Sequence, residues 1–133
     1  MPDNDNFEKI AEPEIIDTYE ALQNALTYSS DVVLTNDITL SEILVIQRRD
    51  FIFDGNGYTL KSTAARAINV SGVDGVTIKN LVIECTGERA INIIQKATNI
   101  TIDKVTATAA NYTVNVAGSA PNAIVNITNS TLN

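Results

Sequence analysis

The sequence contains neither histidine nor tryptophan, and cysteine occurs only once in its 133 residues. The absence of histidine excludes His-ligated metal sites and every mechanism that needs an imidazole base. A single cysteine forms no disulfide within the chain, and we expect Cys85 to be a buried, inert thiol because no histidine is present to activate it. We therefore expect neither a metal nor a cofactor.

Charged side chains are missing altogether from residues 105–133 and are unevenly placed elsewhere. Residues 1–42 hold ten acidic residues and one basic residue, whereas residues 43–133 hold six acidic and eight basic residues. The net charge of −7 argues against binding to nucleic acid or to anionic lipid, since that affinity comes from lysine and arginine. No apolar run of about 18 residues is present, so we expect no membrane insertion, and residues 1–16 lack the pattern of a secretion leader.

Short segments of similar sequence recur at a spacing of 23 to 25 residues. The clearest copies are residues 66–70 (RAINV), 89–93 (RAINI) and 112–116 (YTVNV), which follow one another at a step of 23 residues. Two further sets of segments repeat in parallel with these copies. The first set is residues 51–53, 76–78, 100–102 and 125–127, and the second is residues 59–60, 81–83, 105–107 and 130–132. Each repeat thus contains three short segments rich in Val, Ile and Thr.

Alternation of apolar and polar side chains marks each segment as a β-strand, because strand side chains point to opposite sides with a period of two. Three strands per repeat, with the same class of residue recurring at each turn, predict an all-β fold: a right-handed, single-stranded parallel β-helix. We expect about four to five coils, stacked roughly 4.8 Å apart. The competing architecture is an antiparallel sandwich, which predicts hairpins but no similarity at a period of three strands.

The two ends of this β-helix are predicted to differ. Asp17–Glu20 resembles a helix-starting capping box, and the apolar residues that follow predict a helix of about ten residues that covers the N-terminal end. We expect residues 1–16 to form an acidic lead-in and residues 17–133 to form the capping helix plus the β-helix domain. No comparable cap follows the last repeat, so either the chain is a fragment of a longer solenoid or its last coil stacks on another copy. In both cases we predict a homo-oligomer or end-to-end stacking through residues 112–133.

One turn carries a family resemblance. Residues 53–60 (FDGNGYTL) resemble a turn that is common in the pectate-lyase-like β-helix superfamily, and the predicted helix followed by residues 31–40 is similar to the start of that fold. The resemblance covers residues 17–133. It implies a β-helix but no single activity, because the superfamily includes lyases, hydrolases, epimerases, phage tailspikes and catalytically silent surface modules. The low charge and the abundant Thr, Asn and Ala look most like modules of large bacterial cell-surface proteins.

Asp54, Lys79, Asp103 and Thr128 recur at equivalent positions of successive repeats. Lys79 separates the two carboxylates by two coils, about 9–10 Å, which is too far for both to bind one calcium ion. We therefore expect a ladder of alternating charges rather than a metal site. Aromatic residues make up only 5% of the chain, so we expect no aromatic platform for stacking a sugar beside these carboxylates.

The candidate ligand-binding residues are Arg66, Arg89, Asn69, Asn92 and Asn115. Stacking would bring the two arginines into neighbouring coils, where paired guanidinium groups could bind a carboxylate, or where Glu84 and Glu88 could neutralise them at a solvated edge. Alternation places the three asparagines on the outer face. There they could either bind a glycan or stabilise the coils through an amide ladder.

From these features we expect a non-catalytic β-helix scaffold or adhesion module of an extracellular or cell-surface bacterial protein, with the last coil as its self-association surface. Catalysis is not decided by the sequence, and a non-catalytic role is favoured because no imidazole is present and no aromatic platform accompanies the few carboxylates of the repeats. The alternative is a polysaccharide-binding or polysaccharide-degrading, lyase-like β-helix protein whose partner is a glycan.

Overall fold

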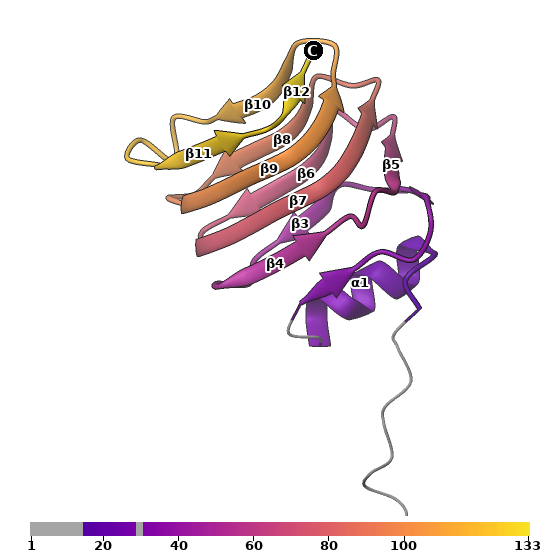
Figure 1. Ribbon diagram of the computed structural model, residues 1–133. Coiled ribbons are helices and arrows are strands. Elements are labelled where there is room, and N and C mark those ends of the chain that lie inside the picture. Colours follow the sequence, from indigo (N-terminus) through magenta and orange to yellow (C-terminus); the bar gives the residue numbers. More distant parts are fainter. Residues whose placement is uncertain (1–14, 29–30) are drawn as a thin grey trace, which may run out of the picture.

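The computed structural model describes residues 15–28 and 31–133, which form one helix followed by short and long β-strands (Figure 1). The helix is α1 (Tyr19–Tyr28). The strands are β1 (Val32–Val33), β2 (Ile38–Thr39), β3 (Leu44–Ile46), β4 (Phe51–Asp54), β5 (Thr59–Ser62), β6 (Arg66–Ser71), β7 (Asp74–Cys85), β8 (Arg89–Ile94), β9 (Thr98–Thr108), β10 (Tyr112–Val116), β11 (Val125–Thr128) and β12 (Thr131–Leu132).

All pairings between these strands are parallel, and they join segments one repeat apart. In the four-stranded sheet β10-β8-β6-β3, Ile68 pairs with Leu44 and with Ile91. The other strands form an eight-stranded sheet that supplies the remaining faces of the coils. The chain is therefore a parallel β-solenoid of about four turns, and the predicted fold class is confirmed, whereas the antiparallel sandwich is excluded.

The strands differ from the prediction at one corner of the coil. Segments 76–78 and 81–83 were expected to be separate, but they are joined in the single strand β7, and the corresponding segments of the next repeat are joined in β9. Asn80 and Lys104 take positive φ angles of 53° and 56° at this corner. One residue in the left-handed region bends the strand without ending its pairing, so each long strand covers two faces of the coil.

The core consists of apolar columns that run along the solenoid. In one of them Phe53, Ile78 and Ile102 stand directly in register and are fully buried. Each coil thus buries the same inward position against the coils before and after it, which makes hydrophobic burial the main stabilising term.

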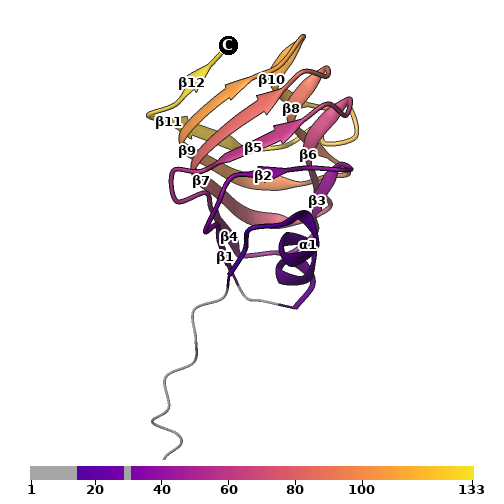
Figure 2. The same cartoon turned by 90° about the vertical axis from the view of Figure 1, so that its right-hand side faces the viewer.

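Helix α1 closes the N-terminal end of this column, as predicted (Figures 1 and 2). Thr18 is the N-cap, since its Oγ1 accepts a hydrogen bond of 3.1 Å from the Ala21 amide. Leu22, Ala25 and Leu26 form the buried face of the helix. Ile16, the last residue of the expected lead-in, is also buried, and residues 1–14 lie outside the described part of the chain.

The opposite end carries no such cover among the described residues, and Figure 1 shows β10, β11 and β12 there, farthest from α1. Ile127 continues the column of Ile102 into the last coil, yet its exposed fraction is 44%, compared with 0% for Ile102. Val114, which pairs with the buried Ile91, is likewise only partly buried. The end of the solenoid therefore presents core positions to solvent.

Candidate functional site

The two candidate arginines lie side by side, as the repeat predicts. Arg66 and Arg89 are the first residues of β6 and β8 and pair in register, and both side chains are half-buried. In the described residues neither Glu84 nor Glu88 forms an ion pair with these arginines. Glu84 pairs in register with Lys61 in the other sheet, away from the arginine column.

The Arg89 side chain has a further feature that the sequence did not reveal. Its Nε atom is buried and has no hydrogen-bond partner, and it is the only side-chain nitrogen or oxygen in this condition within residues 15–28 and 31–133. Buried polar groups are normally paired, since an unpaired one has lost its hydration without compensation. The Arg89 guanidinium is therefore a partly desolvated charge without a protein partner.

Tyr112 extends the arginine column into the last coil. It pairs in register with Arg89, and its exposed fraction is 55%. The sequence predicts no aromatic platform near the repeat carboxylates, and Tyr112 was not predicted to lie beside the arginines. The signal was available, because Tyr112 follows Arg89 at the same 23-residue step.

The three candidate asparagines form an amide ladder. Asn92 Nδ2 donates to Asn69 Oδ1 at 3.1 Å, and Asn115 Nδ2 donates to Asn92 Oδ1 at 2.8 Å. Asn92 has an exposed fraction of only 3%, because its partners in the ladder lie on both sides of it. Two amide–amide hydrogen bonds join the three side chains within the protein, which favours a structural role over ligand binding.

Asp54, Lys79, Asp103 and Thr128 stand in register, as predicted, so that Lys79 lies between the two carboxylates along the row. Within the described residues no ion pair joins Lys79 to either carboxylate. Both carboxylates accept hydrogen bonds from asparagines at the strand corner instead. Asn80 Nδ2 donates to Asp54 Oδ1 at 3.1 Å, and Asn129 Nδ2 donates to Asp103 Oδ1 at 3.0 Å.

Hydrogen bonding also changes the acidity of one of these groups. Asp103 Oδ1 accepts a second bond, of 2.7 Å, from Thr128 Oγ1. The bonds from Asn129 and Thr128 hold the pKa of Asp103 below its ordinary value, because they stabilise the ionised carboxylate. A low pKa suits a structural acceptor and not a general acid at neutral pH.

Cys85 is buried at the end of β7, as expected. Its Sγ lies 3.3 Å from the carbonyl oxygen of Arg89, to which the thiol donates. No group of three or more potential metal ligands is found in the part of the chain that the structure describes.

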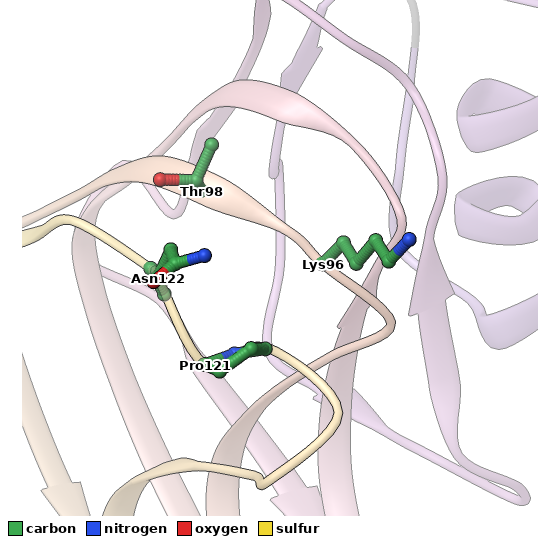
Figure 3. Close-up of a pocket in the computed structure, with 5 residues that line it drawn as sticks. Lys96, Thr98, Pro121 and Asn122 are labelled. Atoms are coloured by element: carbon green, nitrogen blue, oxygen red, sulfur yellow. The ribbon is translucent and has the colours of Figure 1, made fainter.

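A small cavity of about 220 Å³ opens between the β8–β9 turn and the loop of residues 117–124, and the sequence analysis did not point to it. Figure 3 shows Pro121 and Asn122 on this loop, with Thr98 and Lys96 beside them. Ser119 holds the loop in place, since its Oγ and its carbonyl oxygen accept hydrogen bonds from two amides of the turn. The cavity carries one cationic group and no carboxylate, so it has no acid–base pair for catalysis.

Comparison with protein-family models, with curated proteins and with solved structures finds no match to this chain. None of the described helices is long and apolar enough to cross a membrane. The class of protein that the coordinates define is a parallel β-solenoid closed by a helix at one end.

Proposed function

We propose that this chain is a non-catalytic scaffold or adhesion module of a bacterial extracellular or cell-surface protein, and that it self-associates through residues 112–133. The observation that carries the proposal is the difference between the two ends of the solenoid. Helix α1 covers the core at one end, whereas Ile127 and Val114 leave it accessible at the other. We assign the chain to the catalytically silent surface modules of the pectate-lyase-like superfamily on the resemblance of residues 53–60.

The last coil has the properties of a self-complementary surface. The exposed apolar side chains of this coil are Tyr112, Val116, Ile124 and Ile127. Full burial of one such side chain contributes about 1.5–3 kcal/mol, so covering the exposed half of several of them stabilises an interface by a few kcal/mol. β10, β11 and β12 also offer strand edges that are unpaired within the described residues.

Charge favours a second copy as the occupant and sets its orientation. Residues 105–133 carry no charged side chain, so two last coils meet without repulsion, whereas the acidic residues are concentrated toward the N-terminus. A tail-to-tail contact keeps the acidic ends of two copies apart, and α1 covers the end that a head-to-tail contact would require.

Sedimentation of two matched variants tests this proposal. Ile127→Lys places a charge in the proposed interface, whereas Ile52→Lys places it on β4 at a similar exposed fraction, 38% compared with 44%. We expect the unmodified chain and Ile52→Lys to associate with rising concentration, and Ile127→Lys to stay monomeric with an unchanged circular dichroism spectrum. A chain that is monomeric at all concentrations, or equal association of both variants, would contradict the proposal.

A polysaccharide-binding role is the second candidate, and one observation favours it: the exposed Tyr112 ring stands in register with the half-buried Arg89. A glycan array tests binding, and release of unsaturated product from polygalacturonate with calcium tests lyase activity. We expect no lyase activity, because the Asp103 carboxylate already accepts hydrogen bonds from the last coil. Activity that disappears in Asp103→Ala would replace the scaffold proposal with an enzymatic one.

A further inference from the structure

The arginines of the described chain fall into two groups. Arg48 Nη1 donates to the Leu26 carbonyl oxygen at 2.9 Å, and Arg49 pairs with the Asp50 carboxylate at 3.3 Å. Arg66 and Arg89 differ from them, because within residues 15–28 and 31–133 their side chains form neither a hydrogen bond nor an ion pair. They are nevertheless less exposed than Arg49.

This arrangement is electrostatically unfavourable as it stands. Two like charges occupy directly paired positions of neighbouring strands, where cross-strand repulsion destabilises the sheet. Burial of the unpartnered Arg89 Nε adds a desolvation cost. The repulsion is offset when an anion binds between the two groups, since each guanidinium then gains charge-assisted hydrogen bonds through its terminal nitrogens.

The spacing of the coils suits such an anion. Neighbouring strands lie about 4.8 Å apart, so the ends of two side chains at paired positions can reach the oxygens of one carboxylate or sulfate group together. Because Arg89 Nε is covered by protein, an incoming group meets the terminal Nη atoms and binds end-on. Carboxylate and sulfate both present oxygens that can bridge two donors in this way.

We propose that Arg66 and Arg89 form a binding site for an oxyanion, one carboxylate or sulfate group of a ligand held between their guanidinium ends. The site goes beyond the scaffold role and lies on β6 and β8, in earlier coils than residues 112–133, although Arg89 pairs in register with Tyr112 of the last coil. If the second candidate function holds, the site selects acidic glycans over neutral ones.

The test is a titration of the whole chain with sodium sulfate, and separately with sodium acetate. The ¹⁵N NMR signals of the arginine Nε–H groups report binding. Sodium chloride keeps the ionic strength constant. We expect saturable shifts at Arg66 and Arg89 and no saturable shift at Arg49. A stronger response to sulfate assigns the site to sulfated ligands, and a stronger response to acetate assigns it to carboxylated ones.

Substitutions then separate site binding from general screening. We expect Arg66→Gln and Arg89→Gln each to weaken binding about tenfold or more, Arg89→Lys to weaken it less, and Arg49→Gln to leave it unchanged. If Arg89→Gln does not fold, Arg66→Gln and the titration of the unmodified chain still decide the matter. A response at Arg66 and Arg89 no larger than that at Arg49, or equal affinity in Arg66→Gln and Arg49→Gln, would overturn the proposal. The self-association test is unaffected by either result.

Discussion

Replacing Ile102 by alanine removes three methyl or methylene carbons from the centre of a continuous core column. Ile102 is fully buried between Ile78 and Ile127, which stand in register with it. A large-to-small change at such a site costs about 2–5 kcal/mol, because the lost burial is joined by the cavity left between rigid neighbouring coils. The same substitution at Ile127, which keeps 44% of its surface exposed, costs about 1–2 kcal/mol in the isolated chain.

Urea denaturation, monitored by circular dichroism, measures the loss of unfolding free energy in each variant. The protein concentration is one at which sedimentation shows a monomer. We expect the free energy of unfolding to fall about 2 kcal/mol further for Ile102→Ala than for Ile127→Ala. The difference should narrow at concentrations where the chain self-associates, because the second copy then covers Ile127. An equal loss of unfolding free energy in the two monomeric variants would refute the claim that neighbouring coils bury Ile102 but leave Ile127 exposed.

Two further predictions concern the polar rows. Asn92→Ala leaves Asn69 and Asn115 without their shared partner and should lower the free energy of unfolding by about 1–3 kcal/mol in urea, whereas Asn126→Ala, at an exposed position, should change it by less than about 0.5 kcal/mol. Because hydrogen bonds lower the pKa of Asp103 in the folded chain, its contribution to stability is present above the unfolded-state pKa and is lost as the pH falls through the lower folded value. Thermal melts of the unmodified chain and of Asp103→Asn should therefore differ at neutral pH and converge in acid, and a difference that does not depend on pH would contradict this assignment.

Much of the fold could be predicted from the sequence because a solenoid repeats its environment. The position of Ile68 is enclosed in the same way as that of Ile91, so both must be apolar, and the spacing between them equals one coil. The helix was predictable for a different reason, since an N-cap residue and an apolar face are local patterns. The joining of two strands in β7 was not predictable. The amino-acid sequence does not distinguish Asn80, which bends a continuous strand, from an asparagine that ends a strand in a loop.

The candidate site was predictable only in part. Register follows from the repeat, so the pairing of Arg66 with Arg89 was expected and found. The partners of each side chain depend on which face of the coil the neighbouring residues join. Residues that are close in sequence can therefore lie on different faces and make no contact. Glu84 is five residues from Arg89 but lies in a different sheet, paired with Lys61.

The amino-acid sequence alone determined the period, the parallel stacking and the helical cap, because these depend on residue class at fixed spacing. Only the tertiary structure decided that Asn92 is enclosed by its ladder, that Arg89 has a covered nitrogen without a partner, and that Ile127 remains accessible at the end of the column. The physical reason is that burial and pairing depend on the atoms of adjacent coils, which become neighbours only when the chain has wound around its core.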